Sequence, residues 1–344
     1  DNNGRLKAID DTDTGDEAAG PEAIIQLHVD RQPEAALARL QSLVQGVIAD
    51  VTLTTSDWLA MKGFAEGVQA ELAVVPVQGA EEDNAEAQAF LNWMINDHFL
   101  FIACCTFDLH DGSADDGLRF VDGSGLGMLR GGDSARARAD QWLSGLAAGL
   151  SASDTDLMVT KTNAKSTGHR PVYMDCVTLK RRDAEGLLVG LYCFIGLFSS
   201  GAYSTPPRQI PLLRKKVEAV YAGARVSPRS HSGRVVANVL DNFPRDALFQ
   251  ISNEDLLATT LGVLSLQERQ RTRLFIIREP FRRFYTCLVY LPRERYSREV
   301  RIAIQAILVE ALGGTDVVFD TQFSVSILAR MHFVIRVPIG LEAR

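Results

Sequence analysis

The chain has 344 residues and a formal net charge of -7, with 46% apolar and 23% charged residues. This length is typical of about two to three domains with ordinary buried cores. No stretch approaches the roughly 18 uninterrupted apolar residues of a membrane span, and the acidic N-terminus does not have the pattern of a secretion signal. The five cysteines form no C-x-x-C pair, so we expect them to be reduced and the chain to be cytoplasmic, with no metal site.

The first part of the chain is acidic. Residues 1–90 carry 17 acidic and five basic side chains, and residues 1–23 are expected to form a polar tail. Apolar residues alternate over 24–29, which predicts a strand. A helix is expected from Pro33, since apolar residues follow at steps of three and four as far as Ile48.

A second strand and a second helix are expected next. Val51 and Leu53 favour a short strand, and Ser56 or Asp57 is a suitable cap for the helix that follows. Residues 76–86, with a proline, a glycine and four acids, are expected to be a linker.

The middle of the chain is rich in strand signals. Aromatic and β-branched residues predict strands at 99–109, 157–161, 172–182 and 187–198, and a helix is expected at 137–150. Arg182 to Gly186 suits a hairpin turn between the last two strands. These elements predict an antiparallel sheet with helices on one side.

From residue 206 the apolar residues recur with the spacing of a helix. Helices are expected at 211–224 and 233–240, and Ser252 with Asp255 resembles a capping box for a third. Beyond residue 268 the pattern predicts strands, a helix ended by two glycines, and further strands, at 273–278, 284–291, 296–312, 317–323 and 329–337. This last order suits a small ferredoxin-like module.

Two basic segments are candidates for binding. Ten arginines lie between 269 and 301, but no nucleic-acid motif accompanies them, so a solvated or neighbour-facing surface is the simpler interpretation. The stretch from Thr160 to Pro171 combines lysine, arginine, histidine and amide side chains. It is either a site for a carboxylate or phosphate, or a structured loop that packs on a neighbour.

Motifs for catalysis are weak. The string Gly123 to Gly127 lacks the third glycine of a dinucleotide fingerprint, so a glycine-rich turn is the better interpretation. An unrelated small enzyme that uses His98 or Cys105 is one alternative, and a perturbed histidine in a deep pocket would support it. No residue is assigned a catalytic, cofactor-binding or metal-binding role.

Several sequence strings carry a family resemblance: Asn96–Phe99, Gly123–Gly127, His169–Asp175, Phe194–Phe198, Ile210–Val217, Phe243–Gln250, Cys287–Tyr296 and Ile327–Val334. In this order, and covering nearly the whole chain from residue 24, they resemble the large bacterial NAD-dependent glutamate dehydrogenases. The resemblance implies an α+β, multi-domain regulatory region with ferredoxin-like ACT modules of βαββαβ type flanking a PAS-like antiparallel sheet module, joined by a helical connector. The implied domains are an acidic tail at 1–23, a partial ACT-like module at 24–75, a PAS-like module at 86–203, a helical linker at 204–268 and a second ACT-like module at 269–338.

The resemblance also implies that catalysis takes place in a different region of the protein. The parent enzyme would oxidise L-glutamate to 2-oxoglutarate and ammonium with NAD, which would bind outside this segment, in a catalytic region nearer the C-terminus of a longer chain. The expected partners are that region, further copies in a homo-oligomer such as a tetramer, and an amino-acid effector, with no nucleic acid and no membrane. Candidate effector residues are Lys161, Asn163, His169, Arg170, Arg282 and Arg283. The alternative is a scaffold that joins subunits and binds no ligand.

Overall fold

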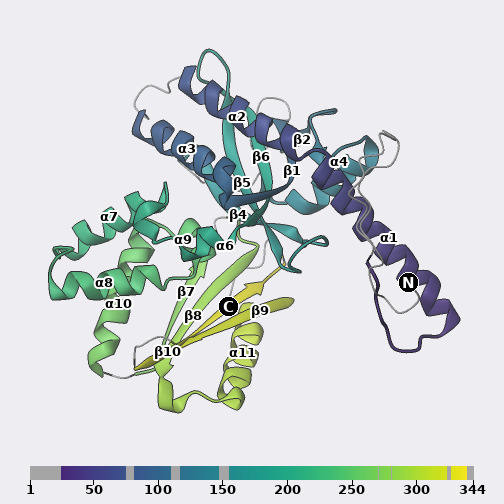
Figure 1. The fold of residues 1–344 in the computed structure, drawn as a ribbon. Coiled ribbons are helices and arrows are strands. Elements are labelled where there is room, and N and C mark those ends of the chain that lie inside the picture. Colours follow the sequence, from purple (N-terminus) through teal and green to yellow (C-terminus); the bar gives the residue numbers. More distant parts are fainter. Residues whose placement is uncertain are drawn as a thin grey trace, which may run out of the picture. The chain divides into compact units, whose positions relative to one another are not determined.

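The computed structural model describes residues 25–74, 81–109, 117–146, 155–269, 271–279, 281–323 and 327–338, so the acidic tail expected at 1–23 lies outside it. Contacts divide the chain into two units, residues 1–46 and 47–344. The second unit contains two antiparallel sheets and a group of helices that lies between them in sequence (Figure 1). The predicted α+β content is therefore confirmed.

Two helices, α1 (Glu34–Ser56) and α2 (Trp58–Val74), come before the first sheet. Both were predicted from apolar spacing, and that spacing places Met61 and Val68 of α2 in the core. Asp57 lies between the two helices, and its backbone carbonyl accepts from the N–H of Met61.

The strands expected at 24–29 and 51–53 are wrong, and so is the part of the expected linker at 81–86; residues 24 and 76–80 lie outside the described ranges. Residues 25–33 form no regular secondary structure, and residues 51–53 lie inside α1. The threonines there are compatible with a helix because their hydroxyls donate to backbone carbonyls one turn earlier. The linker expected at 76–86 instead contains the start of α3 (Glu81–Trp93), where acidic side chains suit a helix N-terminus.

The first sheet follows α3 and a π-helical turn, η1 (Met94–His98). Its strand order is β2-β1-β6-β5-β4, with β3 paired to β1. The strands are β1 (Phe99–Leu109), β2 (Leu118–Phe120), β3 (Leu126–Gly127), β4 (Leu157–Lys165), β5 (Tyr173–Arg182) and β6 (Leu188–Phe198). The four strands predicted in this region are confirmed, and Gly186, with φ 83°, provides the left-handed position of the turn between β5 and β6.

Helices cover both faces of this sheet, so the expectation of helices on one side is wrong. Phe90 of α3 belongs to one apolar cluster with Cys104 of β1. Helix α4 (Asp133–Leu143) contributes Trp142 to a different cluster, which contains Cys105 of β1. Successive side chains of a strand point to opposite faces, so β1 contributes to both cores.

A group of helices connects the two sheets in sequence. It comprises α6 (Ser200–Ser204), η3 (Pro207–Gln209), α7 (Leu213–Ala224), α8 (His231–Asp241), α9 (Arg245–Gln250) and α10 (Asn253–Arg269). The predicted cap of α10 is confirmed, because the backbone N–H of Asp255 donates to Ser252 Oγ at 3.0 Å. Helix α9 was not predicted, since six residues are too few to show a helical period.

The second sheet has the order β7-β8-β10-β9. Its elements are β7 (Arg273–Arg278), β8 (Phe284–Pro292), η4 (Arg293–Arg295), α11 (Arg298–Leu312), β9 (Asp316–Phe323) and β10 (Leu328–Arg336). Helix α11 ends at Gly313 in the left-handed conformation, as predicted. Strands β8 and β9 with α11 form a split βαβ unit that has β10 in its middle.

The chain order of this module differs from the expected βαββαβ. Strand β7 pairs with β8 through a short turn, so the observed order is ββαββ. Helix α11 covers one face, where Leu308 clusters with Phe333, and α10 contributes Val263 to a cluster with Leu288 of β8. Among the described helices, none combines the length and apolar character needed to cross a membrane.

Candidate functional site

Lys161 joins three elements through two ion pairs. Its Nζ lies 2.6 Å from Asp175 Oδ1 of β5 and 2.8 Å from Asp246 Oδ2 of α9. Burial alone would lower the pKa of Lys161, but the two carboxylates outweigh burial and raise that pKa. Lys161 is therefore a charged link between β4, β5 and α9, and protein carboxylates already compensate its charge.

The two carboxylates share Lys161 unequally. The side chain of Asp175 is 2% exposed and that of Asp246 is 29% exposed. Burial raises the pKa of Asp175 to about 6, although Lys161 opposes this shift. Burial would also raise the pKa of Asp246, but Lys161 and the Tyr203 hydroxyl, which donates to it, hold that pKa below its usual value. Asp175 is therefore the first carboxyl of the cluster to take up a proton.

Arg283 forms a second buried cluster beside Lys161. It has 1% of its side chain exposed, and its Nη2 lies 2.9 Å from Glu279 Oε1, which is equally buried. The same nitrogen donates to Thr160 Oγ1 at 2.8 Å and to the carbonyl of Lys161 at 2.7 Å, and the Thr160 hydroxyl donates to Glu279. These bonds connect the β7–β8 turn to β4 of the first sheet.

The other predicted residues do not join this cluster. Asn163 of β4 donates to Ser144 Oγ at 2.7 Å and accepts from Arg336 of β10. His169 and Arg170 line a different, open hollow, where Arg170 donates to the carbonyl of Phe198 at 2.9 Å. Arg282 is exposed, with φ 58° in the β7–β8 turn. The six candidates are thus spread over four places.

A cavity of about 210 Å³ lies between the two sheets, and we call it the inter-sheet hollow. It is lined by Lys161, Thr162, Val172, Tyr173, Asp246, Phe284, Asp316, Val318, Phe319, Asp320, His332, Val334 and Arg336. Its cations are Lys161 and Arg336, and its carboxylates are Asp246, Asp316 and Asp320. Valine and phenylalanine side chains of β8, β9 and β10 supply most of its apolar wall.

One end of this hollow is held by hydrogen bonds between the sheets. Tyr173 Oη of β5 donates to Asp316 Oδ2 of β9 at 2.7 Å, and Lys165 Nζ lies 3.2 Å from the same oxygen. The bond from Tyr173, together with Lys165, holds the pKa of Asp316 below its usual value. The guanidinium of Arg336 lies 4.8 Å from the Tyr173 ring. Charges of both signs are thus fixed within one small space.

A second cavity, of about 380 Å³, shares Asp246, Asp320 and His332 with the first. Arg245 of α9 and Arg330 of β10 also line it, and we call it the arginine hollow. Sequence reasoning assigned no function to Arg245, Arg330 or His332. Arg245 and Arg330 each lie within a string that resembled the dehydrogenase family, but nothing in their spacing places them together.

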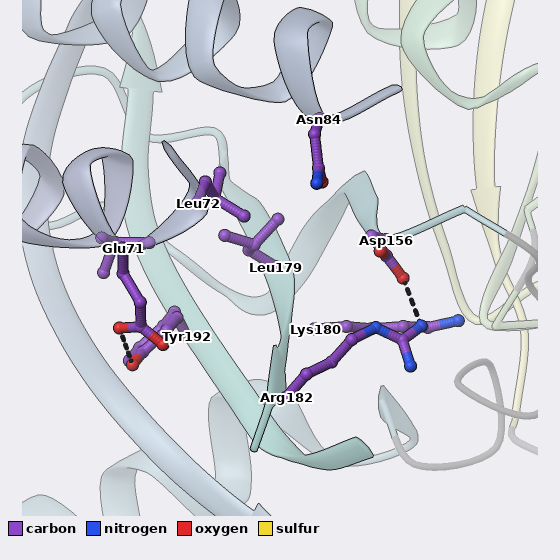
Figure 2. Close-up of a pocket in the computed structure, with 9 residues that line it drawn as sticks. Glu71, Leu72, Asn84, Asp156, Leu179, Lys180, Arg182 and Tyr192 are labelled. Atoms are coloured by element: carbon purple, nitrogen blue, oxygen red, sulfur yellow. Dashed lines mark hydrogen bonds and ion pairs between the residues drawn. The ribbon is translucent and has the colours of Figure 1, made fainter. Parts of the chain in front are cut away.

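A third hollow, between α2, α3 and the β5–β6 part of the first sheet, is too small to be the effector site. Its volume is about 30 Å³, room for little more than a water molecule. Figure 2 shows two pairs of its polar side chains: Tyr192 Oη donates to Glu71 at 2.6 Å, and Arg182 donates to Asp156 at 2.7 Å. Burial and the bond to Glu71 raise the pKa of Tyr192, so this hydroxyl stays protonated.

The glycine-rich turn before α4 has a structural explanation. A Cβ on Gly125 would lie 1.8 Å from the Leu129 carbonyl oxygen, and Gly127 has φ 63°. The N–H of Gly127 donates to Asp57 Oδ2 at 2.8 Å, and Arg130 pairs with the same carboxylate at 2.7 Å. Gly127 therefore allows close packing against β1 and α2, and Gly125 allows close approach to the backbone of Leu129.

Cys105 and His98, the candidates of the small-enzyme alternative, do not have the surroundings of catalytic residues. Burial raises the pKa of the Cys105 thiol, which disfavours the reactive thiolate. His98 stacks on Trp93 at 4.6 Å and contacts the Trp93 carbonyl through Nδ1 at 3.0 Å. Within the described ranges, no three His, Cys, Asp or Glu side chains are grouped so that they could hold a metal ion.

Two family models match the chain. "Glutamate dehydrogenase, helical motif 1" matches residues 210–269, and "Glutamate dehydrogenase, ACT2 domain" matches residues 273–343. The second sheet and α11 are thus an ACT-like domain.

The chain is similar to NAD-specific glutamate dehydrogenases over most of its length. It is 34% identical to that of Halomonas elongata over 96% of this chain and 31% identical to that of Pseudomonas aeruginosa over 97%. The protein from Mycobacterium tuberculosis is 28% identical over 91% of this chain. The chain spans about a fifth of the length of these relatives: 21%, 21% and 18%. The resemblance predicted from the sequence strings is confirmed.

A search of solved structures finds an Erythrobacter litoralis EL346 blue-light activated histidine kinase. It is 11% identical, with a TM-score of 0.19, over 68% of this chain and 95% of that chain. At that TM-score the likeness supports no inference about fold or function.

Proposed function

We propose that this chain, which matches NAD-specific glutamate dehydrogenases over nearly all of its length, is a regulatory and assembly region of such an enzyme. The parent protein would convert L-glutamate, NAD and water to 2-oxoglutarate, ammonium and NADH in a part of the polypeptide outside this segment. That the relatives are about five times longer supports this division, because they have room for a separate catalytic region. The proposed compartment is the cytoplasm.

The domain assignments are part of this proposal. They comprise the tail at 1–23, a partial ACT-like module at 24–75, whose described residues contain helices α1 and α2 and no strand, a PAS-like module at 86–203, the helical linker at 204–268 and the second ACT-like module at 269–338. We propose that the partners are the catalytic region of the same polypeptide and further copies of the chain, assembled as a tetramer.

The observation that carries the regulatory role is the inter-sheet hollow. A ligand bound there would contact β4 and β5 of the first sheet, α9 of the connector, and β9 and β10 of the ACT-like domain. Such a ligand stabilises whichever arrangement of the modules forms the hollow, and so shifts the equilibrium between arrangements. An effector acting from this position needs no contact with the reacting atoms.

The charges of the hollow favour an amino acid as the effector. A zwitterion presents a carboxylate for Arg336 or Lys161 and an ammonium group for Asp316 or Asp320. Asn163 contributes indirectly, since it accepts from Arg336 and thereby positions it. We retain Arg283 as a residue that supports the Lys161 backbone. His169 and Arg170 would serve one further contact and Arg282 another, and the structure supplies no ligand chemistry for either.

Calorimetry with each of the twenty common amino acids tests the sensing role. We expect at least one of them to release or absorb heat in binding the chain. The variant Val334→Trp should abolish that binding because it fills the hollow, whereas Ile302→Trp, on the exposed surface of α11, should not.

The alternative is a scaffold that joins subunits and binds no ligand. Exposed apolar side chains on α11 and β9, including Ile307 and Phe319, favour it as a second candidate. If light scattering shows oligomers, and no amino acid gives heat of binding or a thermal shift, the scaffold role is favoured over the sensing role.

A further inference from the structure

Two buried arginines line the arginine hollow without a carboxylate partner. Arg245 is 6% exposed and Arg330 is 9% exposed. Neither makes an ion pair within 4.0 Å to any residue that the structure describes, whereas the buried Arg283 pairs with Glu279 at 2.9 Å. Burial without a carboxylate at ion-pair distance is costly for a guanidinium, so two such cases beside one cavity need an explanation.

Each arginine has donors to spare. Arg245 donates through Nη2 to the Thr205 carbonyl at 2.9 Å, while its buried Nε and Nη1 have no hydrogen-bond partner among the described residues. Arg330 lies beside the neutral hydroxyl of Tyr290, and its buried Nε likewise has no hydrogen-bond partner in the part of the chain that the structure describes. Burial lowers the pKa of both arginines, although Asp241 and Asp246 oppose this shift at Arg245 and Asp320 opposes it at Arg330.

His332 provides a third polar group between the two cavities. It lines both of them, and its Nε2 is buried with no partner in the described residues. Burial, and then the charge of Arg330, lowers the pKa of His332 to about 4, so the imidazole is neutral near pH 7. A neutral imidazole can donate one hydrogen bond to an anion without adding charge.

We propose that the arginine hollow binds the carboxylate of a small organic acid, with Arg245 and Arg330 supplying the positive charge and His332 a further hydrogen bond. A planar guanidinium matches a carboxylate in two parallel bonds. The body of the acid would extend past His332 into the inter-sheet hollow, which shares three lining residues with this one. The inference does not require amino-acid sensing, because an organic acid without an amino group can bind Arg245, Arg330 and His332 in the same way.

The carboxylates around the cavity favour a singly charged head group over phosphate. Asp246 is engaged by Lys161 at 2.8 Å and by Tyr203 at 3.0 Å, and Asp241 lies 3.7 Å from Arg208. Asp320 is exposed on β9. A phosphate dianion would meet these three negative charges with twice the repulsion of a carboxylate.

Matched acids and amides test the proposal. We expect propionate or succinate to raise the melting temperature of the chain and to give measurable heat of binding, while propionamide and succinamide do neither. Arg330→Met should weaken binding of the acid at least tenfold. The unliganded variant should melt no lower than Arg298→Met, a control at an exposed arginine of α11, because a buried charge without an ion pair is being removed.

Several outcomes would overturn the proposal. They are binding of inorganic phosphate in place of the organic acids, equal binding of acids and amides, and no binding of any acid, which would mean that only water occupies the cavity. Unchanged affinity in Arg330→Met and in Arg245→Gln would also reject it. If amino acids fail to bind but propionate or succinate binds through Arg330, the sensing role falls and the carboxylate site stands.

Discussion

Arg283 and Arg330 are both buried at the second sheet, but their surroundings differ. Arg283 has Glu279 at 2.9 Å and also bonds to Thr160 and the Lys161 backbone, so its contacts link the two sheets. Arg330 lies beside the neutral hydroxyl of Tyr290, forms no ion pair with a residue that the structure describes, and faces a cavity. Both side chains are buried, but only Arg283 has a carboxylate at ion-pair distance that compensates its charge.

This difference separates two uses of a buried charge. A compensated guanidinium holds elements together, and removing its partner leaves a charge in a medium of low polarity. An uncompensated one gains most from a ligand that brings the missing negative charge. The following variants probe the two cases, from the largest expected effect to the smallest.

The largest effect is expected at the compensated pair. Glu279→Gln leaves Arg283 buried without an opposite charge, and we expect a loss of about 3–5 kcal/mol in the free energy of unfolding. Urea denaturation measures this loss, with Glu310→Gln, at an exposed glutamate of α11, as the control. The double variant Glu279→Leu/Arg283→Met should recover most of it. A loss under about 1 kcal/mol in Glu279→Gln would contradict the structural role of the pair.

Lys161 is expected to show the next largest effect. In Lys161→Met the carboxylates of Asp175 and Asp246 lose their shared cation, which we expect to cost about 3 kcal/mol at pH 8. The loss should be smaller at pH 5, because Asp175, whose pKa is already raised to about 6, then takes up a proton. Denaturation of wild type, Lys161→Met and the exposed control Lys215→Met at both pH values provides the comparison. Equal losses at pH 5 and pH 8 would show that Asp175 is not the titrating group.

His332 should determine the pH dependence beside the uncompensated arginine. Its pKa is about 4 in the folded chain, against an ordinary value of 6.5 for a solvated histidine. Between these values the unfolded chain binds more protons, so this group makes stability rise with pH. The groups that act on it are Arg330, Asp246, Asp320 and Lys161.

Asp175 contributes the opposite slope. Its pKa lies at about 6 in the folded chain, against an ordinary value of 3.8, so in this window the folded chain binds more protons and stability falls as pH rises. His332→Gln removes the rising contribution, and stability should then fall by about 1–2 kcal/mol from pH 4 to pH 6 relative to wild type. Denaturation at pH 4, 5 and 6 measures this, with the exposed His231→Gln as control. An unchanged profile in His332→Gln would mean that the histidine is not held neutral.

The smallest loss of stability is expected at a helix cap, where the hydrogen bond joins two neutral groups. Ser297 Oγ accepts from the backbone N–H of Val300 at 3.2 Å at the start of α11. Ser297→Ala should cost about 1 kcal/mol, as is usual for a helix cap. The cap Ser230 of α8, which accepts from Gly233 at 2.9 Å, offers a matched measurement. If Ser297→Ala costs as much as Glu279→Gln, charge compensation is not what distinguishes the buried pair.

The local elements were readable from the sequence because their causes are local. The aromatic run at 99–109 is β1, Gly313 ends α11, and Ser252 with Asp255 caps α10, as predicted. The segment 51–53 shows the limit of this reasoning. Its β-branched residues favour a strand, but hydroxyl bonds to the preceding turn are compatible with continuation of α1.

The candidate site was only partly predictable. Lys161 and Arg283 were identified as basic residues in suitable segments, and the structure places them side by side. Arg245 and Arg330 were not identified, since one lies in a helix of six residues and the other in an apolar strand. Their common cavity depends on how α9 and β10 pack, which no spacing along the chain encodes.

The sequence by itself determined the α+β content, most helices and strands, and the resemblance to glutamate dehydrogenases, because propensity, capping and periodicity act over a few residues. Only the tertiary structure decided which buried charges are compensated. Thr160 and Arg283 are 123 positions apart, and their hydrogen bond exists only because the β7–β8 turn packs against β4. Whether a buried arginine is a structural link or a binding group depends on such distant neighbours, since electrostatic compensation acts through space and not along the chain.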